Sequence, residues 1–496
     1  MEKCGYGNDR IFRSLRPPVY LPQDPNTSLA SFLFRNSDSY PDRIAIVSNG
    51  FTKLGLQKGD VVAMLAPNSA QFSICFLGIV AIGAIATTFN PSNTATEITK
   101  QIEESEPKLI VTVDQLYEKF KGVGLPFVIL GSSDSSFLIE LSASDVFQGL
   151  AFAPVKQTDT ALLRYTSGTT STSKGVVLTH RNFIATSQMA TSDQDCYGEM
   201  HSVFLCCLPM FHIFGLSVIL YAQLQRGNTL VSMGKFDVQM VLRSVEKHKV
   251  THLYVYPPIM LALAKQNFVK NYDLSSIRVL GSGASPLGKD IMEECARKLP
   301  QATIIQGYGM SRMTETCGII SFENPYEGVR NSGSTGPLVP GVESKIVCVD
   351  TMNPLPPTQF GYLNNPKESN LTKDDHGWVN TGDFGYFDEQ GHLFVVGRIK
   401  ELIKYKGIHI APSELEVLLV SHPEILDAAV IPYPDAEAGE IPIAYIVHVR
   451  KFIELRVVPI KRLRKLIFVS SIPKSGGGKI LRRQLIDKVR AGYNAN

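Results

Sequence analysis

The chain has 496 residues, about three times the ~150 residues typical of one domain, so more than one domain is expected. Apolar residues make up 44% and charged residues 19%, which excludes a disordered chain, because disorder requires few apolar and many charged residues. The 49 basic and 46 acidic residues leave a net charge of +3, too small for a dedicated nucleic-acid-binding protein.

Basic residues are concentrated at the C-terminal end. Residues 451–496 contain 12 Lys and Arg against 2 Asp and Glu, a net charge of +10, so the preceding residues carry −7. A basic end can meet nucleic acid, a membrane or a polyphosphate ligand, or it can be a solvated surface.

Cysteine usage and hydropathy indicate the compartment. The eight cysteines form no Cys-x-x-Cys pair, which indicates a reducing environment without structural zinc. The longest apolar run, residues 76–86, is shorter than the ~18–20 residues that cross a bilayer. Residues 1–10 lack the apolar core of a signal peptide, and the last three residues differ from a Ser-Lys-Leu peroxisomal signal. We therefore expect a cytoplasmic protein with no transmembrane segment.

Short β-branched runs alternate with segments of helical periodicity, which predicts an α/β architecture with largely parallel sheets. Thr94 and Glu97 form a capping box at a helix start, and Ser285-Pro286 predicts the cap of a helix over residues 291–299. The composition shifts near residue 400, which places a domain boundary at 398–400. Further expected elements are strands at 43–47, 61–65, 109–113, 160–165, 203–208, 252–255, 278–280 and 303–305, and helices at 76–86 (running into a strand), 237–247 and 257–266.

The strongest chemical signal is the run of hydroxyl residues and glycines between Tyr165 and Gly175, which contains a single lysine, Lys174. Exposed N–H groups and hydroxyls in such a loop can surround a polyphosphate while the lysine balances its charge. The spacing differs from that of a Walker A loop. Without further context, a polar surface hairpin is the commoner explanation, because Ser/Thr/Gly loops are common.

Two segments further on carry groups suited to a nucleotide. Residues 306–310 follow a predicted strand, and Tyr308 offers a flat face to an aromatic ring such as adenine. Glu315, a little further along, is a plausible magnesium ligand or an ordinary surface charge. Asp383, in Thr381-Gly382-Asp383, can accept both hydroxyls of a ribose, or it can belong to an Asx-type turn.

Lysines and one histidine complete the candidates. Lys479 stands at the tip of the glycine loop 475–478, where a lysine can reach a site or remain in solvent. His212 lies in an apolar loop, where a structural role is the commoner one. Gly281-Ser282-Gly283 gives only weak support for a dinucleotide site, because Pro286 occupies the third glycine position. The chain contains neither Gly-x-Ser-x-Gly nor His-Glu-x-x-His, so neither a serine hydrolase nor a zincin has motif support.

Taken in order, these motifs resemble the adenylate-forming acyl-CoA synthetases, and in particular the plant 4-coumarate–CoA ligase-like group. The likeness spans nearly the whole chain, through residues 166–175, 208–216, 306–310 with 314–318, 378–383, 398–407 and 473–483. The resemblance implies a large N-terminal region (1–397) of parallel-sheet subdomains plus a β-barrel-like subdomain. A hinge (398–400) and a small mobile α+β C-terminal domain (401–496) would follow.

The resemblance also implies two half-reactions and their reagents. A carboxylate attacks the α-phosphate of Mg-ATP and releases pyrophosphate, and the thiol of coenzyme A then displaces AMP from the acyl-adenylate. ATP, Mg²⁺, coenzyme A and a small carboxylic acid are therefore the expected ligands. The acid would be of the 4-coumarate or the fatty and oxylipin type. A monomer or weak dimer is expected, and some members of the family are peroxisomal.

Site residues follow from position in the family's motifs. The residues implied in ATP or AMP binding are Thr166, Ser167, Gly168, Thr169, Thr170, Ser171, Lys174, Gln306, Gly307, Tyr308, Thr314, Asp383, Arg398 and His409. Those implied in catalysis are Lys479, His212 and Lys400, and the implied metal ligand is Glu315. Those implied in coenzyme A binding are Lys235, Lys404, Lys406 and Gly407, and the implied substrate pocket contains Phe214, Val218, Gly281, Gly283 and Ala284.

The sequence also departs from the family. Ser171 replaces a glycine of the phosphate loop, residues 311–313 appear inserted, and His409 stands where a glutamine is usual. The segment after Gly50 appears shortened. The expected activity is thus that of an ATP-dependent acid–CoA ligase, reduced by these changes. The alternatives are a nucleotide- or acyl-binding protein with impaired catalysis and an adenylating enzyme with another acceptor.

Overall fold

We describe the fold from a computed structural model of the chain. The residues described are 4–35, 51, 54–131, 154–166, 174–199, 201–309, 318–327, 331–348, 351–357, 361–366, 378–406, 408–422, 424–435, 437–447, 463, 465–474 and 480–490. The chain divides into two compact units, which we describe separately. Unit 1 comprises Met1–Pro17, Tyr254–Tyr308 and Ile320–Asn496, and unit 2 comprises Pro18–Leu253 and Gly309–Ile319.

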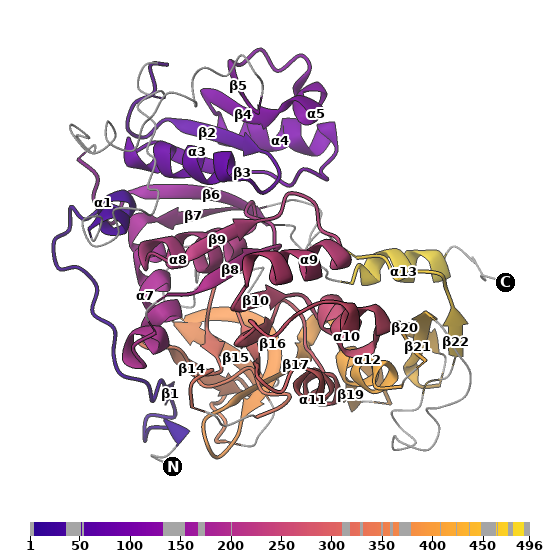
Figure 1. The fold of residues 1–496 in the computed structure, drawn as a ribbon. Helices are drawn as coiled ribbons and strands as arrows, with labels where there is room; N and C mark the ends of the chain where they lie inside the picture. Colours follow the sequence, from indigo (N-terminus) through magenta and orange to yellow (C-terminus); the bar gives the residue numbers. More distant parts are fainter. Residues whose placement is uncertain are drawn as a thin grey trace. The chain divides into compact units, whose positions relative to one another are not determined.

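Unit 2 contains a six-stranded sheet that is parallel except for its last pair of strands (Figure 1). Its strands read as short apolar runs because a parallel sheet is buried on both faces. Their order across the sheet is β5 (Phe127–Leu130), β4 (Leu109–Val113), β2 (Val61–Leu65), β3 (Ile85–Thr88), β6 (Thr160–Thr166) and β7 (Lys174–Thr179). The helices of this part of the unit are α1 (Leu29–Phe34), α3 (Ala70–Ala81), α4 (Ala95–Ser105), α5 (Asp114–Tyr117), η3 (Glu118–Phe120) and α7 (His180–Cys196).

A second group of parallel strands in unit 2 surrounds β8. Strand β8 (Val203–Cys206) pairs with β9 (Thr229–Ser232) on one side and with His252 and Leu253 of β10 (His252–Val255) on the other. The π-helix η4 (Phe214–Tyr221) and the helices α8 (Ala222–Gln225) and α9 (Val238–His248) connect these strands.

Unit 1 begins its core with a parallel pair, β11 (Val279–Ser282) and β12 (Thr303–Tyr308), and β13 (Ser321–Phe322) joins β12 antiparallel. The register of the parallel pair places Ser282 opposite Gln306, so both strands end at the same edge. The helices of this part are α10 (Pro257–Lys265), η5 (Asn267–Asn271) and α11 (Lys289–Lys298).

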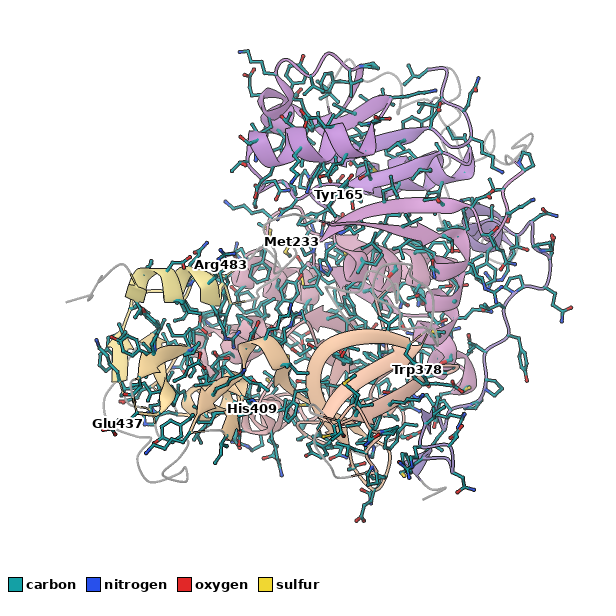
Figure 2. All side chains as sticks on the ribbon, turned by 180° about the vertical axis from the view of Figure 1, so that it is seen from behind. Tyr165, Met233, Trp378, His409, Glu437 and Arg483 are labelled. Carbon is teal, nitrogen blue, oxygen red and sulfur yellow. The ribbon has the colours of Figure 1, made fainter. Side chains whose placement is uncertain are left out.

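An antiparallel five-stranded sheet follows in unit 1. Its order is β1 (Phe12–Arg13), β14 (Glu343–Val347), β15 (Gly361–Pro366), β16 (Trp378–Phe387) and β17 (Leu393–Arg398). Trp378, the single tryptophan of the chain, is buried at the start of β16, and the Lys345 ammonium lies 3.9 Å from the centre of its ring (Figure 2).

The C-terminal part of unit 1 is a mixed sheet with two helices. The short η7 (Ile399–Glu401) leads from β17 into it. Its elements are β18 (Ile403–Tyr405), β19 (Ile408–Ile410), α12 (Pro412–Val420), β20 (Asp427–Asp435), β21 (Gly439–Val447), β22 (Lys465–Phe468) and α13 (Arg482–Arg490). Leu415 and Leu419 of α12 pack into a buried cluster with Ile403, Val430 and Ala444.

Most predicted elements occur, and several boundaries move. The Thr94–Glu97 capping box is present, and the apolar run after Ala70 is a helix that leads into a strand. The predicted cap at Ser285 is wrong, because α11 begins at Lys289 with Gly288 as its N-cap. The strand predicted at 203–208 ends at Cys206, the one predicted at 278–280 is Val279–Ser282, and the one predicted at 43–47 lies outside the described residues.

The predicted fold class is confirmed. The chain is α/β, with parallel-sheet subdomains and a C-terminal α+β part, and the antiparallel five-stranded sheet is the part that was expected to be barrel-like. Within the residues described, no helix is both long enough and apolar enough to cross a bilayer.

Candidate functional site

The first group of candidate residues lies at the carboxyl edge of β11 and β12 in unit 1. Gln306 is buried, and its side-chain Oε1 accepts a hydrogen bond from the Leu287 backbone N–H at 2.8 Å, which anchors the loop after β11. In that loop a Cβ atom on Gly283 would lie 3.3 Å from the Gly307 carbonyl oxygen. Ala284 adopts φ of +70°, in the left-handed region that costs a non-glycine residue about 1 kcal/mol or more. Backbone is therefore held close to this edge, where α/β proteins bind ligands.

Asp383 joins this edge through two side chains from different strands. The Tyr308 hydroxyl donates to Asp383 Oδ2 at 2.6 Å, and Arg398 Nε lies 3.5 Å from Asp383 Oδ1. Asp383 and Arg398 face one another in the β16–β17 register, and the Asp383 N–H donates to the Thr381 hydroxyl at 3.1 Å. The three predicted nucleotide residues Tyr308, Asp383 and Arg398 thus form one hydrogen-bonded and ionic cluster.

The electrostatics of this cluster are those of a buried carboxylate with two donors. Asp383 is 5% exposed, and Tyr308 is also buried. Burial, and then the Asp383 charge, raise the pKa of Tyr308 well above its ordinary value. Tyr308 therefore remains a neutral O–H donor at physiological pH.

The predicted phosphate loop is closed by the β6–β7 hairpin of unit 2. Thr166 and Lys174 are opposite one another in the register, and Tyr165 faces Gly175. The ends of the loop are therefore held in a fixed antiparallel pair. The residues between these ends lie outside the described part of the chain.

His212, also in unit 2, follows β8 in a loop fixed by hydrogen bonds. The Asn68 side chain donates to the carbonyls of Cys206 and Leu208 at 3.2 and 2.8 Å and accepts from the Met210 N–H at 2.6 Å. Thr88 donates to the Phe211 carbonyl at 2.9 Å. These contacts hold the histidine against the carboxyl edge of β2 and β3.

The His212 imidazole is neutral. Removal from water, and secondarily the Arg164 guanidinium, lower its pKa to about 3. The Phe214 N–H points to Nδ1 at 3.4 Å, so Nδ1 is the acceptor and the ring proton belongs on Nε2. His212 can therefore donate one hydrogen bond from Nε2 at neutral pH without carrying a charge.

The predicted pocket residues of unit 2 lie on the π-helix that follows. Phe214 is its half-buried first residue, and Val218 is buried one turn later. A Cβ atom on Gly318 would lie 3.4 Å from Val218 Cγ2, and Gly318 has φ of +123°, so a glycine is required there. The other predicted pocket residues, Gly281 with Gly283 and Ala284, belong to unit 1.

The predicted coenzyme A lysines are exposed. Lys404 of β18 is paired with His409 of β19, which Figure 2 labels, and Lys406, directly after β18, has φ of +46°. Lys400 is exposed in η7, and Lys235 is exposed just before α9 in unit 2. Their ammonium groups are thus available to an anionic ligand.

Several predicted residues cannot be placed. Within the described ranges there is no group of three or more His, Cys, Asp or Glu side chains that could hold a metal ion. The predicted site residues outside those ranges are Ser167, Gly168, Thr169, Thr170, Ser171, Thr314, Glu315, Gly407 and Lys479.

Two local interpretations of the sequence are wrong. Residues 306–308 do not follow a strand but form the end of β12. Thr381 and Asp383 do not lie in a turn but in the ten-residue strand β16, although Gly382 has the positive φ of +74° that a turn would use. The β15–β16 register shifts between Asn380 and Phe384, and the β16–β17 register begins at Asp383, so the positive φ of Gly382 lies at an irregularity within the strand.

Two functional neighbours were not predicted, Asn68 and Arg164. Asn68 follows a strand end in Pro67-Asn68-Ser69, so its position at the carboxyl edge of β2 was a usable signal. Arg164 belongs to β6, and its influence on His212 depends on a contact between distant segments that no local pattern encodes.

Two protein-family models match the chain. A model described as AMP-binding enzyme matches residues 39–364, and one described as AMP-binding enzyme C-terminal domain matches residues 414–479. The chain belongs to the AMP-binding enzyme family. The first match covers the carboxyl edge of β11 and β12, and the second covers β20, β21 and β22 of the C-terminal sheet.

Curated relatives align over nearly the whole chain. A probable CoA ligase from Humulus lupulus is 40% identical, and the peroxisomal OPC-8:0-CoA ligase 1 from Arabidopsis thaliana is 39% identical, each over 98% of this chain and 97% of its own length. The first alignment has 540 positions, so at least 44 of them have no residue of this 496-residue chain opposite. This agrees with the interpretation that segments usual in the group are shortened here.

Solved structures give the same fold. An anthranilate CoA ligase in complex with anthranoyl-AMP aligns with a TM-score of 0.81 at 23% identity, covering 95% of this chain and 99% of that one. The o-succinylbenzoate CoA synthetase from Bacillus subtilis, in complex with its acyl-adenylate, aligns with a TM-score of 0.75 at 26% identity over 94% and 98%.

Proposed function

We propose that the protein is an ATP-dependent carboxylic acid–CoA ligase that acts through an acyl-adenylate. The observation that carries this proposal is the cluster of Tyr308, Asp383 and Arg398, a buried carboxylate between two donors at a strand edge suited to a nucleotide. The similarity to CoA ligases along nearly the full chain supports the same conclusion.

The nucleotide end of the site is assigned to the Asp383 cluster. Asp383 accepts the hydroxyl hydrogens of the ribose, Tyr308 lies against adenine, and Arg398 contacts the nucleotide. Gln306, Gly307 and His409 complete this end of the proposed site. A carboxylate suits this role because Tyr308 and Arg398 already orient its oxygens, so little rearrangement is needed on binding.

The polyphosphate end is assigned to the loop between Thr166 and Lys174. Its hydroxyls and N–H groups bind the β- and γ-phosphates, and Lys479 balances negative charge as the acid attacks. Glu315, with Thr314 beside it, supplies a carboxylate of the kind that Mg²⁺ prefers, and the ion would screen the phosphate charge when bound. In this step the carboxylate oxygen bonds to the α-phosphorus and pyrophosphate leaves.

The thioester step is assigned to the C-terminal segment. In this proposal residues 401–496 turn about the hinge at 398–400, which includes Lys400, so that the coenzyme A thiol reaches the acyl carbonyl and AMP leaves. Lys404, Lys406 and Gly407, with Lys235, contact coenzyme A. His212 donates from Nε2 to orient the adenylate, a role that its neutral state permits.

The acid is proposed to be a fatty or cyclopentanone-type acid rather than a phenolic one. Phe214 stands where the resembling 4-coumarate ligases have a tyrosine near the far end of the phenol ring. A buried phenol hydroxyl without a partner costs roughly 1–3 kcal/mol, which removes the advantage of 4-coumarate. The resemblance to an OPC-8:0-CoA ligase points in the same direction.

The test is ATP–pyrophosphate exchange with a panel of medium-chain, oxylipin-type and hydroxycinnamic acids, followed by detection of the acyl-CoA. We expect exchange with at least one acid, and thioester formation only when coenzyme A is present. Lys479→Ala serves as the internal comparison, because it should abolish most exchange and spare thioester formation from supplied acyl-adenylate. Exchange that yields amides or oxidised products instead of a thioester would show an adenylating enzyme with another acceptor. No exchange with any acid would leave a binding protein.

A further inference from the structure

A lysine of the N-terminal family match holds the end of a helix in the C-terminal match. Lys265, the last residue of α10, donates from Nζ to the carbonyl oxygens of Val420, His422 and Ile425 at 2.7, 2.7 and 2.9 Å. Figure 1 shows α10 and α12 next to one another in unit 1, in agreement with these contacts. The three donors of one ammonium are thus all used by the last residue of α12 and the segment that follows it.

One of the three acceptors is the kind of group that a helix end leaves unsatisfied, and the other two, His422 and Ile425, belong to the segment that follows α12. Val420 is the last residue of α12, and the final carbonyls of a helix have no intrahelical donor and carry the negative end of its dipole. A half-buried ammonium satisfies both needs, and burial lowers the pKa of Lys265, as expected for a charge withdrawn from water into such a contact. The contact therefore has the chemistry of a helix cap supplied from outside the helix.

Helix α12 is itself bonded to other elements of the C-terminal segment. The buried Glu416 of α12 accepts two hydrogen bonds from Arg482 Nη2, at 2.8 and 2.6 Å, and one from the Val430 N–H at 2.8 Å. Arg482 also pairs with Glu401 of η7 at 2.9 Å. A displacement of α12 would therefore disturb its contacts with β20 and α13, and through Arg482 the contact with the short helix η7 at the proposed hinge.

A second contact between the same two matches is sterically tight. A Cβ atom on Gly288, the N-cap of α11, would lie 2.5 Å from Val417 Cγ1 of α12. Gly288 has φ of −67°, which any residue tolerates, so only the approach of α12 requires the glycine. Lys265 and Gly288 therefore hold the same helix in one place by different means.

We propose that Lys265 is a latch that holds the C-terminal segment in the arrangement seen here, and that its release separates the two half-reactions of the ligase. This inference rests on the proposed function for its kinetic consequence, but not for the latch itself. A segment that turns about residues 398–400 must break the three Lys265 bonds, so their strength sets how long the protein stays in this arrangement.

The kinetic test uses Lys265→Met, which keeps the length of the side chain and removes its donors. We expect the rate of pyrophosphate exchange and the rate of thioester formation from supplied acyl-adenylate to change by different factors. The two factors should differ at least fivefold. Lys265→Arg should stay within about twofold of the wild type in both, because a guanidinium can still donate to several carbonyls. Lys270→Met, which alters an exposed lysine five residues away, is the matched control. Equal factors for the two half-reactions in Lys265→Met overturn the proposal.

A second set of variants tests the arrangement without Lys265. Gly288→Ala should push α12 away and unbalance the half-reactions in the same direction as Lys265→Met, and the added change Val417→Ala should restore the balance. Hydrogen exchange of the unliganded protein, read at the amides of residues 398–403, should be faster in Lys265→Met than in Lys270→Met. If the wild type adenylates no acid, the proposed function fails and the exchange measurement still decides the latch. Unchanged exchange at these amides overturns it.

Discussion

The Asp383 cluster of unit 1 favours the charged form of its ionisable group, whereas the His212 loop of unit 2 favours the neutral form. Asp383 has a hydroxyl and a guanidinium as neighbours, so a carboxylate can remain charged although it is buried. His212 is withdrawn from water beside the Arg164 guanidinium, so its imidazole stays neutral. A buried group keeps its charge where the fold supplies a partner of opposite sign and loses it elsewhere. Unit 1 thus offers a buried carboxylate and unit 2 an uncharged donor.

Removal of the charged member should have the largest effect. Asp383→Ala leaves the partly buried Arg398 without its carboxylate, and loss of one partner of a buried ion pair typically destabilises the site by 3–5 kcal/mol. We expect kcat/KM for ATP in pyrophosphate exchange to fall on the order of a thousandfold, about 4 kcal/mol. In Asp383→Asn, which keeps the shape of the side chain and can still accept a hydrogen bond from Tyr308, kcat/KM for ATP should fall less. A loss below about tenfold in Asp383→Ala, with the melting curve unchanged, would contradict the comparison.

Removal of one donor to Asp383 should have a smaller effect. Tyr308→Phe keeps the ring and deletes the 2.6 Å hydrogen bond to the carboxylate, and hydrogen bonds to charged groups are worth about 1.5–3 kcal/mol. We expect ATP affinity, measured by calorimetric titration, to decrease by roughly ten- to a hundredfold. Unchanged affinity would mean that Arg398 alone orients Asp383.

A second neutral histidine of unit 2 extends the comparison to stability. His180 is fully buried, its Nδ1 accepts from the Leu29 N–H at 3.0 Å, and burial lowers its pKa to about 4. Between its unfolded pKa of about 6.5 and its folded pKa, only the unfolded state binds the proton, so stability falls as pH decreases through this window. Stability should therefore fall by about 2 kcal/mol more in the wild type than in His180→Gln between pH 7 and pH 5. Urea unfolding at both pH values measures the difference, and parallel pH dependence of the two proteins refutes the assignment.

The smallest effect is expected for a variant that separates the two causes of the low His212 pKa. Arg164→Met removes the positive neighbour but not the burial, which is the larger cause. The pKa of His212 should therefore rise from about 3 and stay below the ordinary value of about 6.5. Histidine ring NMR, with His212→Gln to assign the signal, measures this shift. A return to an ordinary pKa would make Arg164, not burial, the dominant cause.

The sequence predicted elements whose own residues determine them. Val61–Leu65 is an unbroken apolar run, and Thr94 with Glu97 closes a local capping box, so neither needs distant contacts. Gly382 shows the limit, because its positive φ suits a turn, yet it lies within β16 where the β15–β16 register shifts between Asn380 and Phe384. Element boundaries near the site were therefore less predictable than the elements themselves.

Family resemblance supplied the names of the site residues but not their contacts. Tyr308 and Asp383 are 75 positions apart, and nothing in either motif indicates that one hydroxyl binds the other's carboxylate. Lys265 belongs to no motif, and its role depends on carbonyl oxygens at and after the end of a helix more than 150 positions away. Such pairs depend on how distant segments pack, which a linear pattern does not record.

The position of Trp378 gives the molecule an optical probe of its own. It is the only indole in the chain, it is buried, and the Lys345 ammonium lies over its ring. Trp378 and Asp383 share strand β16, so a ligand that moves this strand changes the surroundings of the fluorophore. Excitation at the red edge of the absorption band, where the 18 tyrosines contribute little, therefore reports on a single strand. Binding of a nucleotide that moves β16 can therefore be followed in real time in the unlabelled protein.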